Sequence, residues 1–387
     1  MKTLSNDTKN IHNALRIARD ALFSCETDIG YAAGAHHFVD LWARDSLFAT
    51  FGANVSGSSA ASKKTVVTFL RFQRADGLVP YLILRSKHGP GKYFGRHTYY
   101  KTPVAQFRSH MSFGIVPDGG VMTIIAARGY GERAGDIRFL TNIYRKLALA
   151  LSWYEKRFAG GLIREWFQCE WADAVLKSGN TLYSNVLYFR AAEDLSWIAN
   201  RLGKSGDARH FSARAAEIRT MINSRLWTGT FFADWNDWKR QDYFATHPNM
   251  LAIIFGLATT HQAEMILRTA KTLVWNGWTA VNSAPKYPIW RVPLFHTVIG
   301  MHDYHNGLVW LQPGILYAVA LHTHGYTKEA KTVLTGIAEK IVSSRGAHEV
   351  YEQDGLPVRR TVYRSEHPFA WSAGLFVWAY HILEKNP

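Results

Sequence analysis

The connections between helical segments alternate in length, and this alternation constrains the fold more than any other feature of the sequence. Apolar residues recur with a helical period in twelve segments. These segments are Lys9–Ser24, Arg44–Asn54, Ser58–Gln73, Asp118–Arg128, Asp136–Arg157, Thr181–Arg201, Asp207–Leu226, Pro248–Ala258, Thr260–Val274, Asn306–His324, Thr327–Ser343 and Glu366–Leu383. Connections after odd-numbered segments are long, beginning with Glu26–Ala43, whereas those after even-numbered segments are short and carry cap residues such as Gly203 and Thr259.

This alternation predicts an all-α fold in which helices pair as hairpins and every long connection lies on one face. Six hairpins that close into a ring give an (α/α)6 toroid, with the even-numbered segments inside and the long loops around one mouth. We expect residues 1–387 to form this single domain. An open α-solenoid is disfavoured because no regular repeat of 34 or 40 residues is visible. Gly77–Leu84 and Val281–Leu294 are punctuated by Gly and Pro, which predicts small β-hairpins over the mouth.

The charge balance indicates a solvated surface. Lys and Arg number 45 against 30 Asp and Glu, a formal net charge of +15, but the basic residues are scattered and form no run of five. The sequence shows no membrane-spanning apolar run and no signal-peptide pattern near Met1–Asp20, and its two cysteines, Cys25 and Cys169, make no disulfide framework. We therefore expect a cytoplasmic protein that binds neither nucleic acid nor membrane; the sequence leaves its oligomeric state open.

The stretch Cys169–Ala174 carries the first candidate catalytic residue. Asp173 stands next to two alanines and close to Trp171, in a loop that leads into the helical segment at Thr181. A partly desolvated carboxyl group keeps its proton more readily, which suits a general acid. Asp173 is therefore a candidate proton donor, and the alternative is that it stabilises the start of the following helix.

Polar and aromatic clusters precede each even-numbered segment, where the toroid would bring them to its mouth. These clusters are Leu41–Ser46, Val116–Gly120, Arg164–Ala174, Thr246–Asn249, His302–Gly307 and His348–Gly355. In the first cluster Asp45 can accept two hydroxyl groups while Arg44 donates, and Trp42 offers a stacking face, a pattern suited to a polyol. Aromatic residues make up 14% of the chain, which favours a surface that stacks on flat ligands.

Other common chemistries lack their sequence signals. His302 and His305, and the pair His36–His37, have neither the helical i, i+4 spacing nor the Cys partners of a specific zinc site, so we expect no metal. Gly-x-Ser-x-Gly, a phosphate loop and a dinucleotide fingerprint are also missing from the sequence, so we expect no cofactor. Two carboxylates from distant loops, Asp173 and Glu349, remain in an aromatic mouth. They are the minimal apparatus for glycoside hydrolysis, with a carbohydrate as the binding partner.

At these residues the sequence resembles the inverting (α/α)6 glycoside hydrolases. This group includes the amylo-α-1,6-glucosidase domain of glycogen debranching enzymes, the neutral/alkaline invertases and, more distantly, glucoamylase and processing α-glucosidase. The matching stretches follow one another over most of the chain: Trp42–Ser46, Trp171–Ala174, Tyr304–Trp310, Glu349–Gly355 and Ala370–Ser372.

The resemblance implies roles for individual residues. Asp173 would act as general acid and Glu349 as general base on a water molecule. The segment after Glu349 has extra residues relative to the family pattern, so Glu352 is an alternative base. The residues implied to bind substrate are Trp42, Arg44, Asp45, Trp171, Tyr304, His305, Asn306, Trp310 and Trp371.

The expected activity is hydrolysis of an α-glucoside or a short α-gluco-oligosaccharide, as by an amylo-α-1,6-glucosidase. The chain lacks the extra domain with which debranching enzymes hold a polymer, so a glycosylated small molecule fits equally well. The alternatives are a sucrose-cleaving hydrolase, and a sugar epimerase or isomerase that uses His247 with His305 or His348. The basic, tyrosine-rich loop Arg85–Arg108 fits a lid, a partner surface or a solvated loop.

Overall fold

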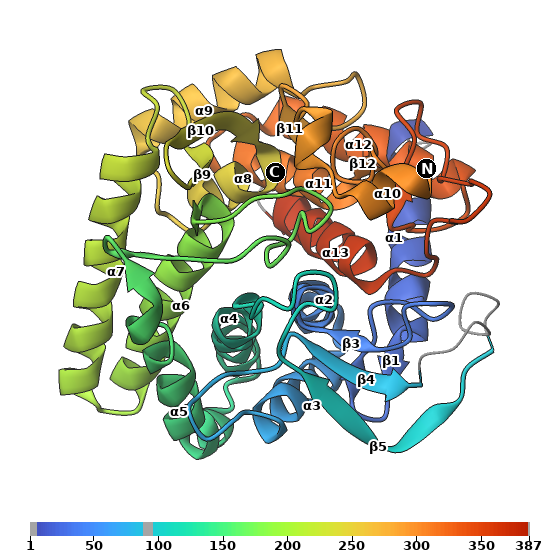
Figure 1. Cartoon of the computed structure of the whole chain (residues 1–387). Coiled ribbons are helices and arrows are strands. Elements are labelled where there is room, and N and C mark those ends of the chain that lie inside the picture. Colours follow the sequence, from blue (N-terminus) through green and yellow to red (C-terminus); the bar gives the residue numbers. More distant parts are fainter. Residues whose placement is uncertain (1–5, 88–95, 386–387) are drawn as a thin grey trace.

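The computed structural model describes residues 6–87 and 96–385 (Figure 1), and within them the protein is mostly helical. Thirteen helices occur in these ranges: α1 (Asn6–Ser24), α2 (Ala43–Ser56), α3 (Ser59–Arg71), α4 (Asp118–Ala134), α5 (Ile137–Ser152), α6 (Leu182–Arg201), α7 (Ser205–Leu226), α8 (Thr246–Ile254), α9 (Thr260–Leu273), α10 (Leu294–Val298), α11 (Leu311–Thr323), α12 (Thr327–Ser343) and α13 (Ala370–Lys385). No helix in the described ranges combines the length and apolar character needed to cross a bilayer.

Six helices form a closed inner ring. Each of α2, α4, α6, α8, α11 and α13 packs against the next, and α13 packs back against α2. The outer helices α3, α5, α7, α9 and α12 each pack on the inner helix that precedes or follows them, and α1 packs on α12 and α13. This arrangement is an (α/α)6 toroid, as the loop alternation predicts. The inner helices are buried on most sides; α11, for example, has only its last residue, Thr323, outside the core.

The ring closes where α13 crosses α2 at two glycines. A Cβ atom on Gly52 would lie 2.2 Å from the carbonyl oxygen of Gly374, and one on Gly374 would lie 2.6 Å from the Cα atom of Ala49. Both distances are too short for a side chain, so the two helix backbones touch. The absence of side chains at these two positions therefore allows the first and last inner helices to meet.

Short strands lead into several inner helices. Strands β3 (Leu41–Trp42), β8 (Asn180–Thr181), β10 (Arg240–Ala245) and β12 (Val309–Trp310) run directly into α2, α6, α8 and α11. Their partners are β4 (Leu82–Ser86), β9 (Ala233–Asn236), β11 (Ser283–Ala284) and β13 (Val350–Tyr351), and β5 (Tyr99–Gln106) pairs with β4. The antiparallel orders are β3-β4-β5, β11-β10-β9-β8 and β12-β13. Two further antiparallel pairs are β1 (Glu26–Thr27) with β2 (Gly30–Tyr31) and β6 (Phe158–Ala159) with β7 (Leu162–Ile163).

Some predicted boundaries were wrong for identifiable reasons. The helix predicted from Asn306 begins only at Leu311, because Val309 and Trp310 pair with β13. The helix predicted to reach Arg157 ends at Ser152 and is followed by a 3₁₀ turn. The short helix α10 was not predicted.

The two patches predicted to form hairpins each contribute to a sheet. Gly77–Leu84 supplies the start of β4, and Val281–Leu294 contains β11. In the loop Arg85–Arg108, strand β5 pairs with β4. Residues 88–95 of that loop, Tyr93 among them, lie outside the described ranges.

Candidate active site

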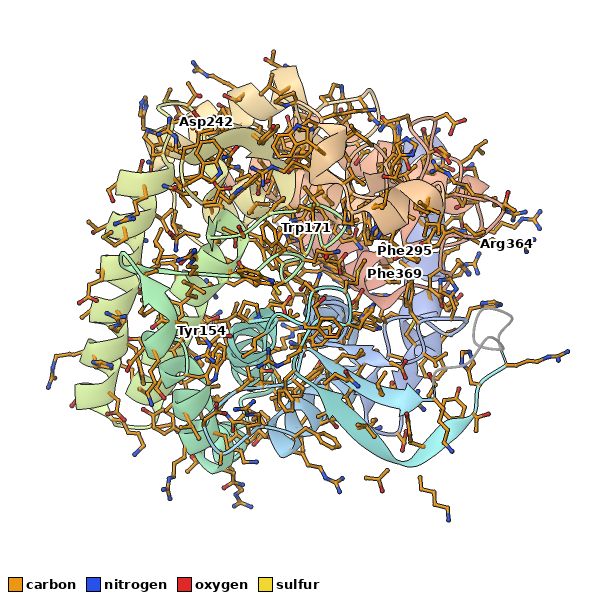
Figure 2. The ribbon with its side chains drawn as sticks, viewed as in Figure 1. Tyr154, Trp171, Asp242, Phe295, Arg364 and Phe369 are labelled. Carbon is orange, nitrogen blue, oxygen red and sulfur yellow. The ribbon has the colours of Figure 1, made fainter. Side chains whose placement is uncertain are left out.

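A cavity of about 590 Å³ lies at the mouth of the ring. Its walls come mainly from the loops that enter the inner helices, and Figure 2 shows Trp171 near the middle of the ring, with Phe295 and Phe369 to its right. The lining residues are Ala33, Phe38, Trp42, Arg44, Asp45, His110, Met111, Gln168, Trp171, Asp173, Pro293, Phe295, His296, Tyr304, His305, Trp310, Glu349, Phe369 and Trp371. The cavity thus combines a broad aromatic surface with a small number of charged groups.

The structure brings most of the predicted site residues to this cavity. Ten of them line it: Trp42, Arg44, Asp45, Trp171, Asp173, Tyr304, His305, Trp310, Glu349 and Trp371. Asn306 and Glu352 do not. The toroid therefore gathers side chains that are more than 300 residues apart in the sequence.

Asn306 does not line the cavity, and its side chain is hydrogen-bonded to a neighbouring loop. Its side-chain oxygen accepts the backbone N–H of Tyr287 at 2.6 Å, and its amide nitrogen donates to the carbonyl of the same residue at 2.8 Å. Both ends of its amide thus bond to the backbone of Tyr287. That Asn306 binds substrate stays a prediction.

Glu352 is also occupied elsewhere. Its Oε1 atom lies 3.2 Å from Nη2 of Arg360, whose guanidinium also holds Asp303 at 2.6 and 2.8 Å. This three-residue network braces the loop after β13. Of the two glutamates considered as base, only Glu349 reaches the cavity.

Arg44 organises the charged side of the cavity around Asp173. Its Nε atom lies 2.7 Å from Oδ2 of buried Asp118, and its Nη1 atom donates to the carbonyl of Glu170 at 3.0 Å. The same Nη1 atom lies 3.8 Å from Oδ2 of Asp173, whose side chain is 29% exposed. The guanidinium is fixed by the first two contacts, so it places a positive charge beside a carboxyl group that still faces the cavity.

His305 supports the same loop as a neutral ring. Its Nδ1 atom accepts the backbone N–H of Ala174 at 3.2 Å and lies 3.8 Å from Oδ1 of Asp173. An accepting nitrogen carries no proton, and burial holds the pKa of His305 well below its usual value. The ring also stacks on Trp310, with centroids 4.7 Å apart. His305 therefore positions the Asp173 loop.

Glu349 occupies a different environment on the other side of the cavity. The hydroxyl of Tyr304 donates to its Oε1 atom and that of Tyr363 to its Oε2 atom, while the backbone N–H of Glu366 lies 3.4 Å from Oε2. Burial raises the pKa of Glu349 to about 7, and the two tyrosine hydrogen bonds oppose this rise. A carboxylate that titrates near neutrality is suited to accept a proton.

Asp45 is a third carboxyl group on the cavity wall. Burial raises its pKa to about 8, the charge of Arg44 opposes the rise, and Glu349 adds to it. At neutral pH Asp45 is therefore largely protonated and can both donate and accept hydrogen bonds, which suits contact with sugar hydroxyls.

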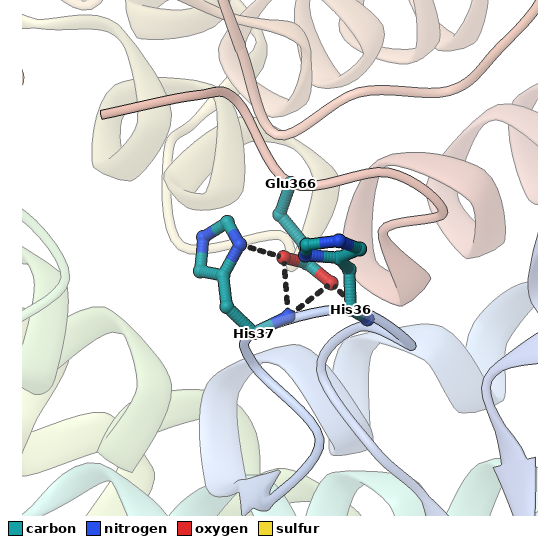
Figure 3. A group of neighbouring side chains, drawn as sticks. All are labelled: His36, His37 and Glu366. Carbon is teal, nitrogen blue, oxygen red and sulfur yellow. Dashed lines mark hydrogen bonds and ion pairs between the residues drawn. The ribbon is translucent and has the colours of Figure 1, made fainter. Parts of the chain in front are cut away.

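Behind Glu349, Glu366 joins the loop at His36 and His37 to the segment that enters α13 (Figure 3). Its carboxylate accepts the backbone N–H of His36 at 2.7 Å and of His37 at 3.0 Å, and lies 2.5 Å from Nδ1 of His37. A Cβ atom on Gly34 would lie 2.3 Å from this carboxylate, so the close approach needs glycine.

The same three side chains are near enough to one another to hold a metal ion, with ligand atoms within 4.8 Å. Both carboxylate oxygens already accept backbone N–H groups, however, which indicates a clamp between two loops. The absence of a metal stays a prediction.

The histidines of the epimerase alternative do not meet in the cavity. His247 is buried against Trp171, with ring centroids 4.9 Å apart, and burial lowers its pKa to about 3. Burial likewise lowers the pKa of His348 to about 4. Of the three named histidines only His305 lines the cavity, so these residues assemble no histidine acid–base pair there.

Several lining residues were missed from the sequence. Phe295 and His296 belong to α10, a five-residue helix too short to leave a periodic pattern. Gln168 lies within the cluster Arg164–Ala174 and could have been included on position alone. The others, Ala33, Phe38, His110, Met111, Pro293 and Phe369, carry no local signal and are assembled by the fold.

A family model describes much of this chain. The model of the mannosylglycerate hydrolase MGH1-like glycoside hydrolase domain matches residues 163–372, more than half of the sequence. The chain belongs to this family. It is therefore a glycoside hydrolase, the broad class that the motifs indicate, although the match does not single out the amylo-α-1,6-glucosidases. A search of curated protein sequences gave no significant match.

Solved structures share the fold at low sequence identity. A GH63 mannosylglycerate hydrolase from Thermus thermophilus, in complex with Tris and D-glycerate, is 13% identical, with a TM-score of 0.71 over 94% of this chain and 99% of that one. A glycosidase variant in complex with glucose is 16% identical, with a TM-score of 0.70 over 100% of both chains. A rhamnosidase from Klebsiella oxytoca with rhamnose bound is 15% identical, with a TM-score of 0.70 over 98% of this chain and 65% of that one.

Proposed function

We propose that this glycoside hydrolase cleaves a short α-glycoside with inversion, using Asp173 as general acid and Glu349 as general base. The observation that carries this proposal is that the two carboxyl groups come from separate loops to one cavity and sit in different surroundings. The assignment of acid to Asp173 and of base to Glu349 rests on the resemblance to the inverting (α/α)6 glycoside hydrolases; both side chains line the cavity, and two tyrosine hydroxyls hold Glu349.

The chemistry follows from these two positions. Asp173 donates its proton to the glycosidic oxygen as the bond to the anomeric carbon breaks. Glu349 removes a proton from a water molecule that attacks the same carbon from the opposite face, so the product has the inverted configuration. Inversion needs room for that water, which requires carboxyl groups about 6.5–9.5 Å apart. Tyr304 and Tyr363 hold the Glu349 carboxylate in a fixed orientation during proton transfer.

The substrate that fits best is one sugar ring joined to a small leaving group. The cavity of about 590 Å³ is in the range of small-molecule pockets, about 300–1,000 Å³. The half-buried ring of Trp42 offers a stacking face, Trp310 and Trp371 complete the aromatic wall, and Asp45 and Arg44 offer hydroxyl contacts. We propose an α-glucoside, either a short α-gluco-oligosaccharide or a glucosylated small molecule. The named activity of the Thermus relative makes an α-mannoside of a small hydroxy acid the second candidate.

A substrate panel tests this proposal. It contains α-1,4- and α-1,6-glucosides, limit dextrin, sucrose, glucosylglycerate and mannosylglycerate, with sugar release followed by proton NMR. We expect release from a small α-glycoside and none from limit dextrin. Preferred cleavage of limit dextrin would favour the amylo-α-1,6-glucosidase activity, and preferred cleavage of sucrose would favour the invertase alternative.

A further inference from the structure

A second cavity, of about 570 Å³, lies next to the first and has a strongly basic wall. Three arginines line it, Arg108, Arg157 and Arg164, together with Trp153 and Trp166. None of these residues lines the catalytic cavity, and none has a part in the proposed hydrolysis.

One loop separates the two cavities. His110 and Met111 face the catalytic cavity, and the next four residues, 112–115, face the second one. Arg108 closes this loop by pairing with Ile115 in a β-bridge and by donating from Nη1 to the carbonyl of Phe113 at 2.8 Å. The position of the wall is therefore fixed by backbone contacts.

The loop is also packed tightly against the segment that carries Trp166. A Cβ atom on Gly114 would lie 2.6 Å from Sγ of Cys169 and 2.8 Å from Cβ of Trp166. At the tip, Phe113 has a φ of 58°, a left-handed conformation that a bulky side chain rarely adopts. Such backbone strain persists only where the surrounding structure maintains it, and it is common at binding sites.

The three guanidinium groups have no acidic partner. Among the residues that the structure describes, no carboxylate lies within 4.0 Å of Arg108, Arg157 or Arg164; the nearby Asp76 pairs with Arg74 instead. Arg157 stacks on Trp153, with its guanidinium carbon 3.7 Å from the ring centroid. The wall therefore carries three guanidinium groups without a direct ion-pair partner in the described chain, and only the more distant charge of Asp76 acts on Arg157.

A buried carboxylic acid completes the wall. Glu165 is 5% exposed and lines the cavity. Its Oε1 atom accepts the hydroxyl of Thr181, and its Oε2 atom is buried from solvent on the side of Ser184. Burial raises the pKa of Glu165 to about 8, so at neutral pH this side chain is mostly uncharged and adds little negative charge to the wall.

We propose that this cavity is a second carbohydrate site, which binds a sugar that carries a carboxylate or a phosphate. The arginines bind the acidic group, since guanidinium forms paired hydrogen bonds with carboxylate and phosphate oxygens. Trp166, 56% exposed, presents its face to the sugar ring. A simple inorganic anion would use the arginines but not the tryptophan.

Binding measurements on the full chain test this site. Titration calorimetry with glucuronic acid, glucose 6-phosphate, glucose and inorganic phosphate is carried out on wild type and on Arg164→Ala, Trp166→Ala and Arg209→Ala. Arg164 and Arg209 are both exposed, and Arg209 lies on α7 and lines neither cavity, so it is the matched control. We expect saturable binding of at least one acidic sugar, a loss of affinity of at least about tenfold in both the Arg164 and the Trp166 variants, and no change in the control.

The same titrations on Asp173→Asn separate this site from the catalytic one. Acidic-sugar binding that persists in Asp173→Asn and fails in Arg164→Ala supports the second site, whether or not any glycoside is hydrolysed. Tighter binding of glucuronic acid identifies a carboxylated sugar, and tighter binding of glucose 6-phosphate a phosphorylated one. Equal binding of inorganic phosphate with no effect of Trp166→Ala would show an anion site only. That result, or affinities that Arg164→Ala leaves unchanged, or no saturable binding at all, would overturn the proposal.

Discussion

At the scale of single residues, the proposed acid is required only when the leaving group needs a proton, whereas the proposed base is required for every leaving group. Fluoride departs without a proton, so a glycosyl fluoride needs the base but not the acid. For Asp173→Asn we expect an ordinary glycoside to be cleaved about 10²–10⁴ times more slowly, while the glycosyl fluoride of the same sugar is cleaved almost normally. For Glu349→Gln we expect both rates to fall. Initial-rate kinetics on the two substrates check this, and equal losses in Asp173→Asn would contradict the role of Asp173.

The hydrogen bonds to Glu349 make a separate prediction about pH. The base has to be ionised, and its pKa is about 7, so kcat/KM should fall as the pH drops below neutrality. The hydroxyl of Tyr363 stabilises the charged form, so Tyr363→Phe should raise this pKa and move the acidic limb of the profile to higher pH. Tyr326→Phe, away from the cavity on the turn before α12, is the control. A profile of Tyr363→Phe that overlays the wild type would refute this assignment.

At the scale of the elements, the contact between α2 and α13 should be sensitive to a single methyl group. Gly374→Ala places its Cβ atom 2.6 Å from the backbone of Ala49, so the two helices have to separate. We expect a loss of about 1–3 kcal/mol in the free energy of unfolding, measured by urea denaturation. The matched control is Gly206→Ala on α7, where no atom lies within 4 Å, and it should be neutral or slightly stabilising. Similar stability of both variants would show that the ring does not close as described.

The elements also show how far the sequence could predict the structure. Helix pairing and the inner ring follow from periodicity and loop length, which are local properties of the sequence. The polar and aromatic clusters that line the cavity could also be predicted, because each lies directly before an inner helix. The contact of Asn306 with the backbone of Tyr287 could not be predicted, because the two come close only in the folded chain. Tyr363 was missed for the same reason, since its contact with Glu349 depends on the path of the loop after β13.

At the scale of the whole molecule, buried carboxyl groups should make stability depend on pH. Burial raises the pKa of Glu165 from 4.5 to about 8, so between these values the folded state keeps a proton that the unfolded state releases. This contribution is fully present below about pH 4.5 and is lost as the pH rises towards 8. Glu165→Gln cannot release a proton, so its unfolding temperature should fall less than that of wild type between pH 5 and pH 8. Parallel curves from thermal denaturation would contradict the assignment.

The central claim is that the two carboxyl groups of one cavity hydrolyse an α-glycoside with inversion, and the configuration of the first product tests it most directly. Proton NMR spectra of wild type with the preferred α-glycoside, recorded before the released sugar mutarotates, distinguish the two anomers. We predict that the β anomer appears first and that Asp173→Asn and Glu349→Gln release far less of it. Initial release of the α anomer would contradict the mechanism, since it would require a covalent intermediate and two displacements.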